Sequence, residues 1–472
     1  MTTPDTVSAA GTADVGVDVQ AIADRVLADF PRTLAELKEL VAIPGIAWEA
    51  FDASQLDRSA EAVAALARSA GMEDVRILSA ETADGRPGSP AVVARRPARP
   101  GKPTVLLYAH HDVQPPGDES LWDTPPFEAT EIDGRLYGRG AADDKAGIMV
   151  HVAALRAVLD ATAAFGVGVT YFFEGEEEAG SPSFRPFLER YRDLLAADVI
   201  VVADSSNWKV GVPALTTSLR GMVGGVFEVR VLEHAVHSGM FGGPVLDAPT
   251  LAARLISTFH DAAGNVAVEG LVARETAAVD YPEDDFRRDA SVLDGVRLAG
   301  TGPLADRLWN KPALSVIGMD VPPVAVSSNT LLPVARVKVS VRLAPGQDPR
   351  AAAEALERHI LGQDLFGARV SFAAEETGNA FSTDTTAPAA RASLWSLEQA
   401  WGVPAVETGI GGSIPFISDL TEVYPEAQIL VTGVEDPDSR AHSANESLHV
   451  EDFRRAVLAE ALLLARIDAE GL

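Results

Sequence analysis

The chain has 472 residues. A single hydrophobic core usually organises fewer residues than this, so we expect two domains. Its composition, 47% hydrophobic and 23% charged, is that of a globular protein, and no run approaches the roughly 20 apolar residues of a membrane span. The net charge of −29 argues against a nucleic acid partner, and the absence of cysteine excludes disulfides, thiolate nucleophiles and Cys-ligated zinc.

The N-terminal residues 1–19 are small and polar, with acidic residues but no basic cluster. They also lack the apolar core of a secretory signal, so we expect a tail ahead of the first helix. A cytoplasmic location fits these observations and is the one we expect.

Helices and short apolar runs alternate along much of the chain. Apolar residues at helical spacing predict helices over Val17–Val41, Ala60–Ala70, Gly147–Leu159, Phe184–Leu195, Ala389–Ala400 and Val450–Ile467. Apolar runs predict buried strands over Thr104–Ala109, Val167–Phe173, Val199–Ala203 and Gln428–Thr432. This alternation is typical of an α/β domain with a mainly parallel sheet.

The middle of the chain has a different pattern. Gly224–Leu232 and Val334–Leu343 alternate their side chains as half-buried antiparallel strands do, and Ala248–Phe259 and Pro349–Ile360 have helical spacing. Two strands and two helices in this order indicate an inserted α+β domain. We therefore predict one domain over residues 1–215 and 386–472, interrupted by a second over residues 216–385.

Side chains that can bind metal follow the apolar runs. The groups, in chain order, are His110-His111-Asp112, Glu176-Glu177-Glu178, Asp204 and, in a later loop, His442. In open α/β sheets, ligands and catalytic groups gather at the carboxyl ends of the strands, where the loops meet. Core packing does not require this arrangement, so the sequence predicts one shared site.

Each group by itself also fits a structural role. A His-His-Asp loop or an acidic triplet at a turn commonly faces solvent, and His442 alone would be a surface histidine. Asp143 and Asp144 could equally mark the start of a helix, where the dipole favours acidic residues.

Two local features favour a metal site. The His110-x-Asp112 spacing in an extended segment places both side chains on the same side, where Asp112 can accept the ring N–H of His110. Adjacent carboxylates such as Glu177 and Glu178 can divide the chemistry, because one can bind metal while the other takes a proton from water.

Two glycine-rich segments, Gly239–Gly243 and Gly409–Ser413, match neither a phosphate-binding nor a dinucleotide-binding loop. The second precedes an apolar segment, so its backbone N–H groups could bind a carboxylate. A plain tight turn fits this segment equally well.

Taken in order, these motifs resemble those of the superfamily that includes carnosinases, glutamate carboxypeptidases, aminoacylases, acetylornithine deacetylases and succinyl-diaminopimelate desuccinylases. The segments that carry the resemblance are Tyr108–Val113, Gly138–Lys145, Glu174–Ser181 and Arg440–Glu446. The resemblance implies a di-zinc amide hydrolase in which Glu177 is the general base and Asp112 orients His110. It also implies that the inserted domain is a lid and dimerisation domain.

The same resemblance implies the ligands of two zinc ions per subunit. One ion is expected to be held by His110, Asp143 and Asp204, the other by Asp143, Glu178 and His442, with Asp143 bridging the two. The Asp143–Asp144 peptide bond is expected to be cis. Oxygen and nitrogen ligands also accept Mn²⁺ and Co²⁺.

The carnosinase branch is the most similar, through Leu219–Gly221, His237–Gly243, Asn329-Thr330, Arg342 and Gly411–Pro415. This similarity implies a homodimer in which His237 enters the partner's site and stabilises the oxyanion. It implies that Arg342, Gly412 and Ser413 hold the substrate's C-terminal carboxylate. Asn329 and Thr330 are expected to contact the substrate.

The predicted function is therefore metal-dependent hydrolysis of the amide bond of dipeptides or other small peptides. An N-acyl amino acid deacylase or desuccinylase is an alternative on the same scaffold, which substrate profiling would distinguish. A one-metal enzyme is a further alternative, which metal counting would decide. A non-catalytic binding protein usually lacks ligands, whereas all five are present in this sequence.

Overall fold

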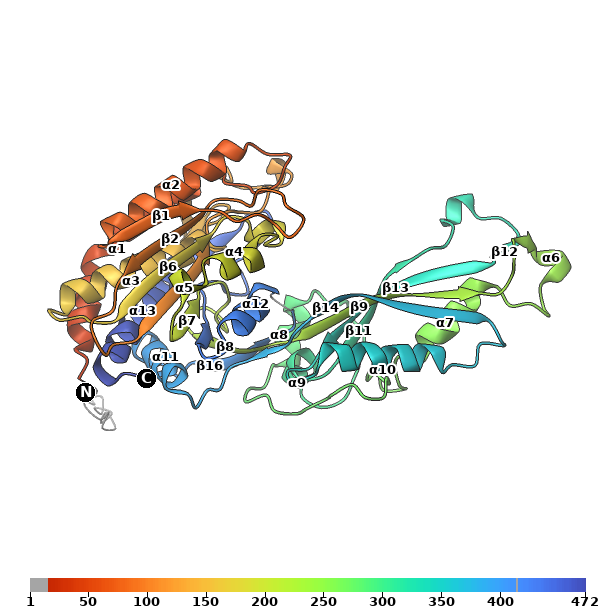
Figure 1. The fold of residues 1–472 in the computed structure, drawn as a ribbon. Helices are drawn as coiled ribbons and strands as arrows, with labels where there is room; N and C mark the ends of the chain where they lie inside the picture. The colour runs from red at the N-terminus through yellow and green to blue at the C-terminus, as the bar shows by residue number, and fades with distance from the viewer. Residues whose placement is uncertain (1–15, 413–414) are drawn as a thin grey trace, which may run out of the picture. The chain divides into compact units, whose positions relative to one another are not determined.

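The structure, a computed structural model, describes residues 16–412 and 415–472 (Figure 1). The chain divides into two compact units. Of the described residues, unit 1 contains 16–216, 383–406 and 419–472, and unit 2 contains 217–382, 407–412 and 415–418. In the described part of the chain, no helix is long and apolar enough to cross a membrane.

Unit 1 is built on a sheet whose central strands are parallel. They are hydrogen-bonded in the order β6 (Gly168–Glu174), β3 (Thr104–His110), β7 (Val199–Val202) and β17 (Gln428–Val431). β2 (Ala91–Arg96) and β1 (Asp74–Leu78) continue the sheet antiparallel beyond β6, and β8 (Ala214–Leu219) pairs antiparallel with β17. The central strands are almost wholly buried, which explains why their sequences are continuous apolar runs. The predicted α/β fold with a mainly parallel sheet is confirmed.

Helix α3 (Lys145–Ala161) lies at the centre of the helical packing of unit 1. It packs against α1 (Val19–Val41) and α13 (Val450–Glu470), and α13 also contacts α11 (Pro388–Trp401). Nearly every residue of α3 is buried, as expected for a helix covered on several sides. The other helical segments of unit 1 are α2 (Ala53–Ser69), α4 (Phe184–Arg190), α5 (Arg192–Leu195), η1 (Glu119–Leu121) and η2 (Glu177–Ala179); α12 (Pro415–Val423) runs from unit 2 into unit 1.

A small three-stranded sheet joins distant parts of the chain. β5 (Arg135–Tyr137) pairs with β4 (Thr130–Ile132) on one side and with β18 (Ser447–His449) on the other. β5 leads directly into the segment that contains Asp143, and β18 follows the loop that contains His442. This pairing therefore brings two predicted ligand segments together.

Unit 2 is a four-stranded antiparallel sheet in the order β11 (Ala313–Met319), β13 (Val334–Leu343), β9 (Gly221–Arg230) and β14 (Arg369–Gly378). α7 (Ala248–Ser257) and α10 (Pro349–Leu361) pack on it around a common apolar core. Smaller elements complete the unit: β10 (Val236–His237), α6 (Ser238–Phe241), α8 (Glu283–Asp289), α9 (Leu304–Trp309), η3 (Val324–Val326), β12 (Thr330–Leu331) and β15 (Phe381–Ser382); β16 (Val406–Ile410), which pairs with β8, lies mostly in unit 2.

The structure differs from the sequence prediction at several elements. The inserted region has β11 and β14 in addition to the two strands predicted there. These are the edge strands of the sheet, and in β11 residues 315–318 are exposed, so the alternation that revealed β9 and β13 is missing. The helix predicted over Phe184–Leu195 is two helices, because the chain breaks at Tyr191.

Candidate metal centre

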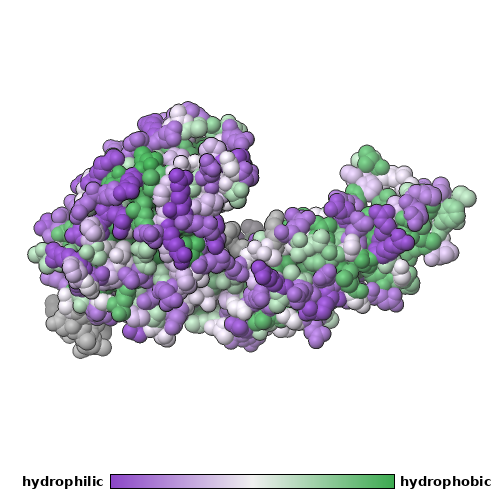
Figure 2. Space-filling model, in the orientation of Figure 1, coloured by the Kyte–Doolittle hydropathy of each residue, from purple (hydrophilic) through white to green (hydrophobic). Residues whose placement is uncertain are grey.

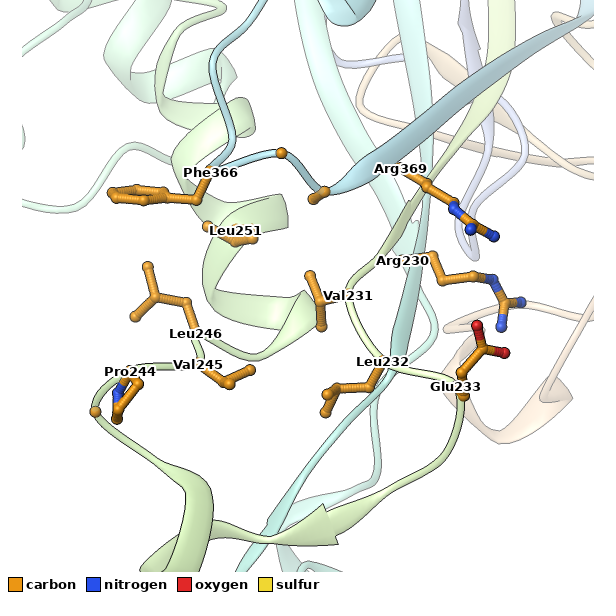
Figure 3. Close-up of a pocket in the computed structure, with 13 residues that line it drawn as sticks. Arg230, Val231, Leu232, Glu233, Pro244, Val245, Leu246, Leu251, Phe366 and Arg369 are labelled. Carbon is orange, nitrogen blue, oxygen red and sulfur yellow. The ribbon is translucent and has the colours of Figure 1, made fainter.

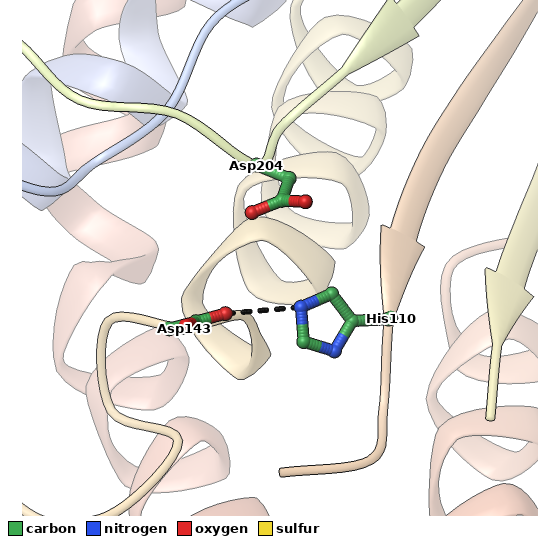
Figure 4. A group of neighbouring side chains, drawn as sticks. All are labelled: His110, Asp143 and Asp204. Atoms are coloured by element: carbon green, nitrogen blue, oxygen red, sulfur yellow. Dashed lines mark hydrogen bonds and ion pairs between the residues drawn. The ribbon is translucent and has the colours of Figure 1, made fainter. Parts of the chain in front are cut away.

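Three of the predicted ligands form a group in unit 1, here called the first triplet: His110, Asp143 and Asp204. His110 ends β3, Asp204 follows β7, and Asp143 lies just ahead of α3, so adjacent parallel strands and the start of a helix bring them together (Figure 4). Each offers a ligand atom within 4.8 Å of the others. His110 Nε2 lies 3.0 Å from Asp143 Oδ1.

A second triplet consists of Asp143, Glu178 and His442. Nε2 of His442 lies 3.0 Å from Asp143 Oδ2 and 3.2 Å from Glu178 Oε2. The two oxygens of Asp143 therefore face different partners, Oδ1 toward His110 and Oδ2 toward His442. This is the arrangement that a carboxylate bridging two cations requires.

The donor chemistry of the two triplets fits divalent metal ions. Two imidazoles and three carboxylates suit zinc, and they also accept manganese or cobalt. Burial is the main cause that raises the pKa of Asp204 to about 7, and the neighbouring carboxylates of Asp143 and Glu178 contribute to this rise. Cations at these positions would relieve the cost of holding several buried carboxylates together.

Glu177 lies beside the triplets but belongs to neither. Burial is the main cause that raises its pKa to about 9, with contributions from Asp204 and other carboxylates. A carboxyl group that is not a ligand and has a raised pKa is suited to exchange protons with a substrate.

Asp112 connects the end of β3 to the turn that contains Glu177 and Glu178. Its carboxylate accepts the backbone N–H groups of these two residues at 3.1 and 3.0 Å. His110 Nδ1 lies 3.1 Å from the Asp112 carbonyl oxygen and 3.4 Å from its Oδ1. The sequence led us to expect the carboxylate as the acceptor for His110, whereas the backbone carbonyl is the closer oxygen.

One other feature of this region agrees with expectation. The Asp143–Asp144 peptide bond is cis. His111, which the extended spacing points away from His110, is fully buried and its Nε2 lies 2.8 Å from the Pro90 carbonyl oxygen.

Glu446 is a functional candidate that the sequence reasoning missed. It is fully buried, and its carboxylate accepts the backbone N–H groups of Gly140, Ala142 and Asp143 at 3.0–3.1 Å. Oε2 also forms an ion pair with Arg139 Nη1 at 2.5 Å. Glu446 therefore holds the loop that presents Asp143. The signal was its place four residues after His442.

Two further side chains hold Glu178. Gln114 Nε2 donates to Glu178 Oε2 at 2.8 Å, and Trp48 Nε1 donates to the Glu178 carbonyl at 3.3 Å. Neither residue was predicted, because an isolated glutamine or tryptophan carries no spacing signal.

The remaining predicted residues lie in unit 2. His237 is exposed at the end of β10, where Thr330 of β12 is its pairing partner and Asn329 O accepts the Ser238 N–H at 3.0 Å. The structure thus brings the predicted His237, Asn329 and Thr330 together. Arg342 lies on β13 and Gly412 follows β16, while Ser413 lies outside the described residues.

A cavity of about 620 Å³ in unit 2 contains none of these residues (Figure 3). Its lining is mainly apolar, with Arg230, Arg369 and Glu233 on one side and Phe366, Leu246 and Leu251 on the other. The clustered side chains that could hold metal lie outside this cavity.

Comparison with known proteins identifies the family. Residues 106–466 match peptidase family M20/M25/M40. A cysteinylglycine-S-conjugate dipeptidase of Corynebacterium striatum is 36% identical over 367 residues, covering 77% of this chain and 80% of that protein. A Beta-Ala-His dipeptidase of Mus musculus is 28% identical over 64% of each chain.

Solved structures share the fold. Human carnosine dipeptidase 1 has a TM-score of 0.74 at 23% identity, and the match covers 96% of this chain and 99% of the human one. The family match spans the segments that carry both triplets and Glu177. The chain therefore belongs to peptidase family M20/M25/M40 and is a metallopeptidase.

Proposed function

We propose that this metallopeptidase is a dipeptidase that binds two zinc ions per subunit and uses Glu177 as its general base. The observation that carries this proposal is the position of Asp143, whose two oxygens face separate sets of ligands beside an uncoordinated glutamate. The two relatives described above are dipeptidases, and this similarity supports the substrate class.

The ligand set assigns His110, Asp143 and Asp204 to one ion, and Asp143, Glu178 and His442 to the other. When bound, the ions supply polarisation of the scissile carbonyl and acidify the attacking water. Glu177 takes the proton of that water and returns it to the leaving amine. Asp112 and Glu446 keep the ligand segments in place through the backbone N–H groups that they accept.

We propose that the enzyme is a homodimer in which His237 enters the partner's site and stabilises the oxyanion. Exposed apolar side chains in unit 2 support an interface: Val324 is 93% exposed, Met240 75% and Val326 72%. Figure 2 shows green surface over η3 and α6, the elements to which these residues belong. Exposed apolar patches commonly mark interaction sites.

We further propose that Arg342, Gly412 and Ser413 receive the substrate's C-terminal carboxylate, and that Asn329 and Thr330 contact the substrate. A guanidinium and backbone N–H groups are suited to bind a carboxylate. The contact of β10 with β12 supports a common role for His237 and Thr330.

Substitution of the base tests the proposed function. Glu177→Gln is expected to keep both metal ions and to lose about 10²–10⁴-fold in kcat on dipeptides, because the carboxamide cannot take the proton. Metal content per chain is measured by elemental analysis beside the kinetics. Glu189→Gln, at an exposed glutamate of α4, is the matched control and should keep wild-type turnover.

Dipeptide turnover by Glu177→Gln at a near wild-type rate would refute the assignment of the base. One metal per chain at saturation would refute the bridged pair. Activity on N-acyl amino acids but not on dipeptides would replace the dipeptidase with a deacylase that uses the same residues.

A further inference from the structure

Arg220, between β8 and β9 in unit 2, is a buried cation. The residue is 8% exposed. Its Nε donates to the Gly411 carbonyl at 2.9 Å and its Nη1 to the Lys311 carbonyl at 3.4 Å. Among the described residues no carboxylate forms an ion pair with it, although a buried charge is usually paired.

The charged group that influences Arg220 is another cation. Arg342 pairs with Met222, two residues after Arg220, so the side chains of both arginines start from the same face of the β9–β13 pair. Burial, together with the charge of Arg342, lowers the pKa of Arg220 to about 10.

Two neighbouring guanidinium groups in a partly dehydrated position repel each other, and this repulsion is relieved when an anion binds beside both. A guanidinium has five N–H donors, and the two described contacts of the Arg220 side chain leave others for a ligand. A carboxylate is the anion whose geometry suits this fork.

Arg220 also positions the loop that follows β16. Its backbone N–H donates to the Ile410 carbonyl at 3.2 Å, beside the side-chain contact with Gly411. A Cβ atom on Gly411 would lie 2.8 Å from Arg220 Nη2 and 3.3 Å from the Leu308 carbonyl. A residue larger than glycine at position 411 would therefore require the guanidinium to shift.

We propose that Arg220 is a positioning residue that makes the enzyme selective for substrates with a free C-terminal carboxylate. It holds the Gly411-Gly412 backbone and places a second positive charge beside Arg342. This inference rests on the proposed function, in which Arg342 and the Gly412-Ser413 segment receive that carboxylate.

The test compares a dipeptide with the same dipeptide bearing a C-terminal amide. For Arg220→Met, kcat/KM for the free dipeptide is expected to fall at least about tenfold, mainly through KM, because the support of the Gly411 backbone and a positive charge near the carboxylate are lost. For the dipeptide amide, kcat/KM of the same variant should change less than about threefold. Arg220→Lys keeps the charge and is expected to retain part of the discrimination.

Arg307→Met is the matched control. Arg307 also donates to two backbone carbonyls of unit 2, those of Gly302 at 2.9 Å and Ala299 at 3.2 Å. Its removal is expected to leave the ratio of the two substrates at the wild-type value. Unfolding temperature and metal content are measured for every variant.

Gly411→Ala provides a second route if Arg220→Met does not fold. The new methyl group displaces the guanidinium without removing its charge, so this variant should also raise KM for the free dipeptide more than for the amide. Equal losses on both substrates in Arg220→Met or Gly411→Ala would overturn the inference, as would a wild-type enzyme that does not distinguish acid from amide. A wild-type enzyme that hydrolyses no dipeptide would instead refute the proposed function.

Discussion

Asp143 depends on neighbours that are not themselves ligands. Its backbone N–H donates to Glu446, and the carboxylate of the next residue, Asp144, accepts the His110 N–H at 3.1 Å. Each of these contacts constrains a ligand rather than a metal. Substitutions at such positions should therefore alter metal affinity and stability before they alter the chemical step.

The buried Glu174, at the end of β6, is expected to make the stability of the protein depend on pH. It is 3% exposed and accepts the Tyr108 hydroxyl at 2.6 Å. Burial raises its pKa from 4.5 to about 8. Between pH 4.5 and about 8 the Glu174 carboxyl keeps its proton in the native protein but loses it in the unfolded chain. The stability that Glu174 contributes is therefore fully present below pH 4.5 and is lost as the pH rises to about 8.

Glu174→Gln removes this titration and can still accept the Tyr108 hydroxyl. The free energy of unfolding of the variant is compared with that of wild type at pH 4.5 and at pH 8.5. We expect this difference to shift in favour of the variant by up to about 5 kcal/mol at the higher pH. Thermal unfolding of both proteins, saturated with metal, measures the difference. The same offset at both pH values would contradict the raised pKa.

Glu446→Gln tests the buried support of Asp143. Because Arg139 stays buried without its partner, the variant is expected to lose about 3–5 kcal/mol of stability. Metal affinity, measured by competition with a chelator, should fall about 10–100-fold. As a control, Glu451→Gln removes a partly exposed partner of Arg454 and should be nearly neutral in both measurements. Wild-type metal affinity in Glu446→Gln would contradict the role of Glu446 as a support of Asp143.

At the scale of elements, α3 shows where helix propensity and packing disagree. By propensity alone, alanine in place of Gly147 would stabilise the helix by about 1 kcal/mol. In the folded protein, a Cβ atom at this position would lie 2.2 Å from Asp144 Oδ1 and 2.8 Å from the Ala203 carbonyl. The glycine allows the start of α3 to approach the end of β7, where Asp204 follows.

Gly147→Ala is therefore expected to destabilise the protein by about 1–3 kcal/mol, measured by denaturant unfolding. Gly318→Ala in β11 is the control, because a Cβ atom there meets only Lys338 Cβ, at 3.7 Å. That variant should be neutral or slightly stabilising. A stabilised Gly147→Ala would mean that the end of β7 can move away from the helix.

At the scale of the whole molecule, the proposed exchange of His237 between subunits predicts complementation. His237→Ala and Glu177→Gln are each expected to be nearly inactive. A mixed dimer contains one site that combines an intact Glu177 with the partner's intact His237, so random exchange should restore up to about a quarter of wild-type activity. Kinetics after mixing, with light scattering to give the mass, measures this.

Two differently tagged variants show whether exchange has occurred. If mixed dimers form and remain inactive, His237 does not act across the interface. If His237→Ala is itself fully active, the proposed oxyanion role is wrong.

The sequence predicted the ligands better than their supports. His110, Asp204 and Glu178 follow apolar runs, and this local signal places them at one edge of a parallel sheet. The supports carry no such signal: Glu446 acts on backbone N–H groups about 300 positions earlier in the chain. The edge strands β11 and β14 were missed because much of β11 is exposed and neither edge strand was distinguished by a clear alternating pattern.

By itself the sequence determined the mainly parallel core of unit 1 and predicted that side chains able to bind metal gather at the ends of β3, β6 and β7. Hydrophobic periodicity and residue type are local properties, so they can be read from the sequence without knowledge of the fold. Only the tertiary structure decided that the two Asp143 oxygens face His110 and His442 separately, that Glu446 holds the Asp143 loop, and that Arg220 contacts the Gly411 carbonyl. Those are contacts between distant segments, and they exist only once backbone groups and charges have been buried together.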